Sequence, residues 1–270
     1  MLKASTRRRK AYGVALKVFW SYFCFYIIGK IRGKNYWDAH INDKHILNAM
    51  RIKDVMLELQ GLFIKFGQLI SILSNILPPE FRKPLEDLQD NVPPHPIDKM
   101  MAVVKKELGK EPNDIFTTID PNPLAAASIG QVHQATIGDQ KVVIKVQHPA
   151  IDQIVHVDLE IIQNIIRLVT RFFKVKGIEH LYQQVEQMIE EELDYLLEAQ
   201  SMQRIKANLS NNELFYIPSV YEEYCSKKVL VIEYCDGCKI TNTQQLTQWG
   251  IDRETLANGF LEGFCQMLLE

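Results

Sequence analysis

The sequence has few cysteine residues, and their number and spacing exclude a disulfide framework. Five cysteines occur in 270 residues, and only Cys235 and Cys238 lie close together. Disulfide-rich folds are short secreted chains with an even number of cysteines, so we expect a reducing, intracellular compartment. The C-x-x-C spacing of this pair also occurs in zinc and redox sites, but zinc needs four ligands and no second pair or histidine follows. We therefore interpret the pair as two small residues beside a turn.

The sequence also lacks a strong net charge, with 31 basic and 33 acidic residues. DNA-binding domains are usually strongly basic, so we expect no nucleic-acid partner. The near-zero net charge is not evenly distributed, because the N-terminal region lacks acidic residues. Residues 1–37 hold nine basic residues and no acidic one, which leaves 22 basic and 33 acidic residues, a net charge of −11, in the rest of the chain. A basic head on an acidic body favours either contact with an anionic surface or a solvated, partly disordered terminus.

No apolar run is long enough to predict a membrane-spanning helix. Such a helix needs about 20 apolar residues, and Lys17 interrupts the most apolar stretch, residues 11–30. No small-residue cleavage site of a signal peptide follows it. Basic flanks and the aromatic residues Trp20, Tyr22 and Tyr26 favour a helix lying in the membrane interface. Packing on the protein's own core and a membrane span are the alternatives.

The first hundred residues have the pattern of helices, and the pattern then changes. Three- and four-residue spacing of apolar residues predicts helices at 40–76, 80–89, 97–109, 152–173, 178–209 and 253–270. Pro78 and Pro79 are expected to end the first of them. Runs rich in Val, Ile and Tyr predict strands at 115–119, 124–135, 141–147, 216–224 and 228–234. Gly138 and Asp139 predict a hairpin turn between the second and third strands.

Three strands, a helical region and two strands form the order found in the smaller lobe of a protein kinase. That lobe needs a flexible loop over the phosphates, a lysine on the third strand and a glutamate that fixes the lysine. Residues 125–132 have the frame of the glycine-rich loop, with alanine in place of its first two glycines. Lys145 ends a V-V-I-K strand thirteen residues after Val132.

The remaining parts of a nucleotide site can also be placed on the sequence. A lysine among apolar neighbours is unfavourable to bury unless it is paired, and the acidic helix supplies Glu190, Glu191, Glu192, Asp194 and Glu198. Backbone groups of Glu233 and Cys235, after the fifth strand, are placed to pair with adenine. Taken singly, Lys145 is a snorkelling surface residue and the glutamates are a solvated face. Together, in this order and spacing, they favour a nucleotide site.

Four motifs carry a resemblance to a known family. They are Lys65-Phe66-Gly67-Gln68 on a helix, Ala125 to Ser128 continuing through Gly130 and Val132, Lys145 within V-I-K-V-Q-H-P, and Glu192-Leu193-Asp194. With these motifs the sequence resembles the UbiB (also AarF) family of atypical kinase-like proteins, over roughly residues 40–270.

The resemblance implies an α+β fold, with a protein-kinase-like N-lobe of antiparallel sheet and helices behind an N-terminal helical extension. The expected regions are a basic aromatic membrane-proximal head (1–37), the helical extension with the K-x-G-Q motif (38–110), the N-lobe (111–235), and the hinge with the start of a larger lobe (236–270). The resemblance also implies ATP with Mg²⁺ or Mn²⁺, and ATPase or small-molecule kinase activity in support of ubiquinone (isoprenoid quinone) biosynthesis.

The same resemblance assigns roles to individual residues. Catalytic roles go to Lys65, Gln68, Glu192 and Asp194, with Lys65 placed near Glu192. Nucleotide contacts go to Ala125, Ala126, Ala127, Ser128, Gly130, Val132, Lys145, Glu198, Glu233 and Cys235, with Glu198 as the partner of the lysine. No residue is assigned as a metal ligand. Because each alanine Cβ keeps the loop backbone farther from phosphate than glycine would, nucleotide selectivity and rate should differ from those of ordinary kinases.

The family's catalytic loop, H-x-D-x-H-x-G-N, and a D-F-G-like metal aspartate occur nowhere in the sequence. We therefore expect a chain truncated before the catalytic loop, with little or no phosphoryl transfer. A non-catalytic membrane-associated pseudokinase or scaffold, and a helical lipid or quinone carrier, are the alternatives. The expected partners are a nucleotide, a membrane surface, and prenyl lipid or quinone-biosynthesis proteins. The expected location is the cytoplasmic side of a bacterial membrane, with the mitochondrial inner membrane as the alternative.

Overall fold

The chain folds into two units that alternate along the sequence. The computed structural model describes residues 2–72, 77–86, 88, 94–172, 178–212 and 214–269. The helical unit comprises Met1–Pro94, Ala126–Gly130 and His148–Glu190, and the sheet unit comprises His95–Ala125, Gln131–Gln147 and Glu191–Glu270. Each unit therefore gathers segments that are far apart in sequence.

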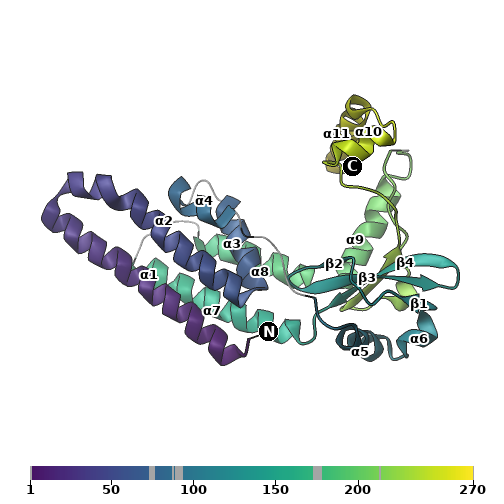
Figure 1. Cartoon of the computed structure of the whole chain (residues 1–270), viewed down its shortest axis with the longest axis horizontal. Coiled ribbons are helices and arrows are strands. Elements are labelled where there is room, and N and C mark those ends of the chain that lie inside the picture. The colour runs from purple at the N-terminus through teal and green to yellow at the C-terminus, as the bar shows by residue number, and fades with distance from the viewer. Residues whose placement is uncertain are drawn as a thin grey trace. The chain divides into compact units, whose positions relative to one another are not determined.

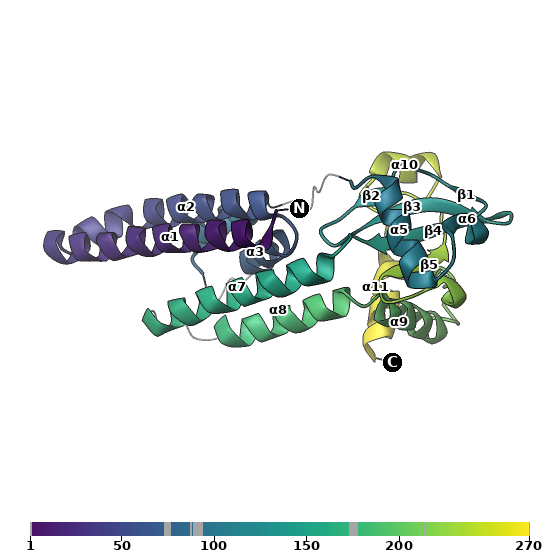
Figure 2. The same ribbon diagram turned by 90° about the horizontal axis from the view of Figure 1, so that it is seen from below.

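The helical unit begins with a long antiparallel hairpin of two helices, drawn in purple and blue in Figure 1. These are α1 (Ala4–Arg32) and α2 (Lys34–Leu59), joined at Gly33, whose φ of 86° favours glycine. They are followed by α3 (Leu62–Ile72) and α4 (Pro79–Glu86). The unit also contains α7 (Ile151–Phe172) and most of α8 (Ile178–Glu192), which lie side by side in Figure 2. The Tyr182 hydroxyl of α8 donates to the Leu159 carbonyl of α7 at 3.4 Å.

One helix expected over residues 40–76 is in fact two, so that prediction was wrong. The chain reverses at Gln60 and Gly61, which have φ values of 55° and 61°. Apolar periodicity continues across the break because α2 and α3 both bury a face in the same unit, so spacing alone does not reveal it. Residues 73–76 and most of 87–93 lie outside the described residues, and so does the predicted end of the helix before Pro78. Pro79 itself is the first residue of α4, a position that proline suits.

The basic N-terminal residues belong to an ordered helix that is anchored to the rest of its unit. Arg7 is 1% exposed, and its guanidinium donates to both carboxylate oxygens of Asp158 in α7, at 2.7 and 2.5 Å. It also donates to the Leu59 carbonyl at 2.6 Å. The exposed Arg8 pairs with Glu160 at 2.7 Å. The predicted disordered terminus is therefore wrong, because the acidic body itself supplies partners for the basic head.

By length and composition α1 can cross a membrane. Its most apolar 18-residue window has a mean hydropathy of 1.4 and is 6% buried. Core helices and signal sequences pass the same criterion. The predicted interfacial helix, which the Lys17 interruption favoured over a span, stays a prediction.

The sheet unit contains a small antiparallel sheet with helices, and this confirms the predicted α+β fold. Strands β1 (Thr118–Ile119), β3 (Gly130–Ile137), β4 (Gln140–Gln147) and β5 (Val229–Glu233) lie in that order, and the short β2 (Ala125–Ala126) pairs with β3. The predicted hairpin turn after β3 is present, with Gly138 at a φ of 57°. In the β4–β5 register Lys145 lies opposite Leu230.

The two faces of the sheet pack on different helices. Alternate β4 residues Val142, Ile144 and Val146 are fully buried against a cluster that includes Met100 and Val104 of α5 (Ile97–Leu108). The intervening face of the sheet meets α9 (Tyr195–Asn208), where Tyr195 and Ala199 pack on Leu230. Because side chains alternate along a strand, Lys145 points to the α9 side while its neighbours build the core. The remaining elements are α6 (Pro112–Ile115), the 3₁₀ turn Glu222–Tyr224, α10 (Thr243–Gln248) and α11 (Arg253–Leu269).

Several predicted boundaries were wrong for physical reasons. The helix expected over 178–209 is interrupted at Leu193 and Asp194, between α8 and α9. The strand expected over 216–224 is reduced to a single bridge, between Val220 and Ile232, and a 3₁₀ turn. Pro218 lies in that run and cannot donate to a ladder. Two further runs divide differently: 115–119 keeps only its last two residues as β1, and 124–135 splits into β2 and the start of β3.

Candidate nucleotide site

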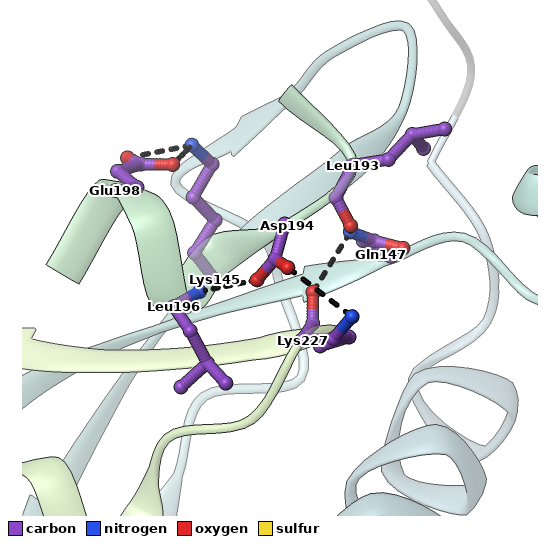
Figure 3. A network of polar contacts seen from close by, with 7 residues as sticks. All are labelled: Lys145, Gln147, Leu193, Asp194, Leu196, Glu198 and Lys227. Carbon is purple, nitrogen blue, oxygen red and sulfur yellow. Dashed lines mark hydrogen bonds and ion pairs between the residues drawn. The ribbon is translucent and has the colours of Figure 1, made fainter. Parts of the chain in front are cut away.

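The predicted lysine and glutamate meet in the sheet unit. Lys145 Nζ donates to both carboxylate oxygens of Glu198, at 2.8 and 2.6 Å (Figure 3). The two side chains are 32% and 39% exposed. The ammonium group is thus held in a fixed position and still faces solvent, so an anionic ligand can reach it.

The interruption between α8 and α9 is what brings Glu198 to the lysine. Asp194 caps α9, because its carboxylate accepts a hydrogen bond from the Leu196 amide at 3.0 Å, and it lies 3.4 Å from Lys227 Nζ (Figure 3). Glu198 then lies one turn into α9, on the side that faces β4. Glu192 is half-buried at the last position of α8. A continuous helix over this segment would place these carboxylates differently.

Gln147, two residues after the lysine, fixes this interruption to β4. Its buried side-chain amide donates to the carbonyls of Leu193 and Lys227 at 2.7 and 3.1 Å (Figure 3). The Tyr195 amide donates to the same Lys227 carbonyl at 3.1 Å. Gln147 belongs to the V-I-K-V-Q-H-P motif, but no role is predicted for it from the sequence. A polar residue at the end of an apolar strand was the available signal, since buried amides need partners.

Tyr195, for which no role is predicted from the sequence, packs beneath the lysine. Lys145 Nζ lies 4.6 Å from the centre of its ring, within cation–π range. Tyr195 is 1% exposed, and burial raises the pKa of its phenol. Its hydroxyl has no hydrogen-bond partner among the described residues. The ring therefore acts here as a packing surface for the lysine rather than as a hydrogen-bonding group.

The alanine-rich loop is held by a histidine that also went unassigned. The Ala127 amide donates to the Gly130 carbonyl at 2.8 Å, and the His148 amide donates to the Ile129 carbonyl at 2.9 Å. The His148 ring Nε2 lies 2.9 Å from the Ala127 carbonyl. Because a carbonyl can only accept, Nε2 carries the proton. Ser128 is buried in this loop, whereas Ala125 and Ala127 are exposed.

The start of β3 is fixed by a buried polar network. The Gln131 side chain, which is fully buried, accepts from the His95 amide at 2.9 Å and donates to the His95 carbonyl at 3.1 Å. Its amide nitrogen also lies 2.8 Å from His133 Nε2, while His133 Nδ1 lies 2.9 Å from the Asp120 carbonyl. Nδ1 is therefore the protonated nitrogen of His133. The neighbouring Val132 is half-buried.

In the segment that is expected to pair with adenine, the backbone amide of Glu233 already has a hydrogen-bond partner. The Glu233 amide donates to the Ser219 carbonyl at 2.9 Å, so only the Glu233 carbonyl is left for a base. The Glu233 carboxylate accepts from the Tyr216 hydroxyl at 2.5 Å, and this bond lowers the pKa of the carboxyl. Cys235 is exposed. Adenine pairing by Glu233 and Cys235 remains a prediction.

Lys65 and Gln68 lie on α3 in the helical unit. The Gln68 side-chain amide donates to the Leu88 carbonyl at 2.9 Å, and Lys65 is half-buried. The glycine between them has a packing reason, because a Cβ on Gly67 would lie 2.6 Å from Met56 Sδ and closer still to Leu88. The predicted proximity of Lys65 to Glu192 concerns residues of the two different units and stays a prediction.

A bound metal ion would have few protein ligands among the described residues. Over the ranges that the structure describes, no three His, Cys, Asp or Glu side chains gather into a metal-binding group. Carboxylate oxygens suit Mg²⁺, which is usually held by one or two carboxylates together with substrate phosphates. Glu192 and Asp194 fit that chemistry as partial ligands, although Asp194 already caps α9.

Comparison with known proteins gives consistent matches. The profile of the ABC1 atypical kinase-like domain matches residues 87–270. The chain is 36% identical over 226 residues to the protein ACTIVITY OF BC1 COMPLEX KINASE 8, chloroplastic, of Arabidopsis thaliana, covering 82% of this chain and 30% of that protein. It is 33% identical over 218 residues to a probable protein kinase UbiB of Marinobacter nauticus, covering 79% of this chain and 40% of that protein.

The chain is also similar in sequence to a protein of known structure. It is the complex of Rv3197 with erythromycin from Mycobacterium tuberculosis, with 29% identity and a TM-score of 0.49, covering 68% of this chain and 47% of that one. The chain thus spans less than half the length of each of these relatives.

Proposed function

The chain belongs to the ABC1 (UbiB) family of atypical kinase-like proteins, and on this premise we propose that it binds ATP together with Mg²⁺ or Mn²⁺. The observation that carries the proposal is the Lys145–Glu198 pair on the sheet unit. Kinase folds use such a pair to hold the α- and β-phosphates. The Tyr195 ring and the half-exposed ammonium group support the same role.

The other residues of the proposed site have narrower roles. Ala125 to Gly130 form the loop over the phosphates, and His148 keeps two of its carbonyls turned toward the protein rather than toward an anion. Glu192 and Asp194 supply carboxylate oxygens for the metal. Mg-ATP, when bound, supplies a transferable phosphoryl group. Lys65 and Gln68 are proposed to complete the phosphate end of the site.

Nucleotide binding is tested by thermal shift of the purified protein with Mg-ATP. Lys145→Ala is expected to abolish the shift, because the phosphates lose their cation. Glu198→Gln is expected to weaken it, because the lysine loses its orienting charge. Lys105→Ala is the matched control, since Lys105 forms an exposed ion pair with Glu111 in the same unit. A shift that survives in Lys145→Ala would show that this lysine does not bind the phosphates.

We further propose that the protein serves isoprenoid quinone synthesis at a membrane. The similarity to UbiB proteins and the apolar helix α1 support this part. The test is the cellular quinone content after chromosomal replacement with Lys145→Ala, measured by chromatography, together with the distribution of the protein between membrane and soluble fractions. Unchanged quinone content would contradict the proposed role in quinone synthesis. It would not contradict the proposed nucleotide binding.

A further inference from the structure

A groove runs between α1 and α2 in the helical unit. Its volume is about 980 Å³, and both helices line it over most of their length. Figure 1 shows the two helices side by side along the hairpin. Small residues on α1, namely Gly13, Ser21 and Cys24, contribute to its wall. A Cβ on Gly13 would meet no atom within 4 Å, so the space beside it is open.

The two ends of the groove differ in chemistry. Near the base of the hairpin it is lined by Arg9, Lys10, Lys17 and Arg51, together with Asp54 and Glu58. Glu58 is neutralised by its ion pair with Lys10. Among the described residues, neither Arg9 nor Lys17 has an ion-pair partner. The base of the groove therefore carries an uncompensated positive charge.

Toward the tip of the hairpin the lining becomes apolar and aromatic. Trp20, Phe25, Ile28 and Tyr36 line this part, with Lys44 stacked near the Phe25 ring. Trp20 is 53% exposed, a high value for a tryptophan in a helix hairpin. From Lys17 to Ile28 the groove extends about 16 Å at the helical rise per residue. Positive charge at one end and an apolar channel at the other are complementary to an anionic amphiphile.

We infer that this groove binds one anionic phospholipid, with the phosphate held by Arg9, Lys17 and Arg51 and an acyl chain lying along Trp20 and Ile28. An acidic peptide would satisfy the charges but leave the aromatic end uncovered. A second copy of the hairpin would bring the basic ends together. The inference rests on the membrane part of the proposed function and names the lipid class and its contacts.

The test uses the purified protein and phospholipids with brominated acyl chains, which quench tryptophan fluorescence on contact. The Trp20 signal is isolated as the difference between the wild type and Trp20→Phe. Vesicles of brominated phosphatidylglycerol are expected to quench this signal more strongly than vesicles of brominated phosphatidylcholine. The double variant Lys17→Glu/Arg51→Glu is expected to weaken the phosphatidylglycerol effect at least about tenfold.

Two further variants separate the groove from general surface charge. Lys30→Glu/Lys34→Glu makes the same change of charge on the same hairpin outside the groove, and is expected to keep most of the quenching. Ser21→Phe fills the groove without changing its charge, and is expected to reduce quenching in both lipids. Circular dichroism confirms that each variant keeps its helices.

The outcomes distinguish this inference from the proposal on which it rests. Equal loss in the two charge-reversed variants, or unchanged quenching in Ser21→Phe, would overturn the groove as the binding site while membrane association stands. Absence of vesicle binding by the wild type would overturn both. Quenching that falls in Lys17→Glu/Arg51→Glu and also in Ser21→Phe, but not in Lys30→Glu/Lys34→Glu, would establish the groove as the binding site.

Discussion

At the residue scale, the motif residues are positioned by contacts that the motifs alone do not reveal. Lys145 is oriented by Glu198 from one side and by the Tyr195 ring from another. Gln147 holds the carbonyls that set the start of α9. Tyr195 and Gln147 are buried. Because an unpaired polar group is costly in the interior, they restrict the geometry more than exposed residues could.

Tyr195 gives a prediction at this scale. Tyr195→Phe is expected to leave stability unchanged or slightly higher, because the ring stays under Lys145 and a hydroxyl without a partner among the described residues is removed. Tyr195→Leu is expected to lower the free energy of unfolding by about 1–3 kcal/mol and to weaken Mg-ATP binding about 2–5-fold. Chemical denaturation and calorimetric titration measure the two effects. If Tyr195→Phe weakens nucleotide binding as much as Tyr195→Leu, the hydroxyl has a role that its geometry does not suggest.

At the scale of elements, one buried ion pair fixes the first helix to the rest of its unit. Arg7 of α1 joins Asp158 of α7 to the carbonyl of Leu59 at the end of α2. Arg7→Met is expected to lower the free energy of unfolding by about 1–3 kcal/mol, because the buried Asp158 carboxyl and the Leu59 carbonyl lose their hydrogen-bond donor. The double variant Arg7→Met/Asp158→Leu is expected to recover most of this loss. A double variant as unstable as Arg7→Met would mean that packing, not charge, fixes α1.

The same carboxyl predicts a dependence on pH. Burial raises the pKa of Asp158 from 3.8 to about 6, despite the opposing effect of Arg7. The folded state therefore binds a proton more readily than the unfolded state, so its contribution to stability is fully present below pH 3.8 and is lost as the pH rises through about 6. Relative to Arg7→Met/Asp158→Leu, the wild type should lose stability over this interval. A difference between the two proteins that stays constant with pH would contradict the raised pKa.

Gly67 of α3 gives a second prediction at the scale of elements. Alanine usually stabilises a helix by about 1 kcal/mol over glycine, but here its Cβ would collide with Leu88 and Met56. Gly67→Ala is therefore expected to lower the free energy of unfolding by about 1–3 kcal/mol. Gly13→Ala is the matched control in α1, where a Cβ has open space, and it is expected to be neutral or stabilising. Thermal denaturation measures both effects, and equal stability of the two variants would contradict the predicted collision at Gly67.

At the scale of the whole molecule, nucleotide binding and phosphoryl transfer can be separated. The chain covers 30–40% of the two curated relatives compared above and contains no H-x-D-x-H-x-G-N sequence. Phosphoryl transfer needs an aspartate at the nucleophile and further metal ligands. The 270-residue chain is therefore expected to bind Mg-ATP without releasing phosphate above the level of Lys145→Ala. Phosphate release that depends on Lys145 would contradict this expectation and assign catalysis to residues in this chain.

The sequence was sufficient for features that depend on local pattern. The helix over 97–109 appears as α5, which ends at Gly109 in the left-handed conformation. The hairpin turn at Gly138 is present, and the Lys145–Glu198 pair forms as the family resemblance implied. Strand alternation and turn chemistry act over a few residues, so they can be read from the order of residues alone.

By itself the sequence thus determined the fold class, the family and which lysine and glutamate pair. Only the tertiary structure decided where helices break, as at Gly61 and Asp194, because apolar spacing continues across a break that long-range packing imposes. It also decided what the basic N-terminus does, since the partner of Arg7 is Asp158, 151 residues away. The groove between α1 and α2 was also decided only by the tertiary structure. It exists only because the two helices lie side by side and small residues of α1 face the space between them.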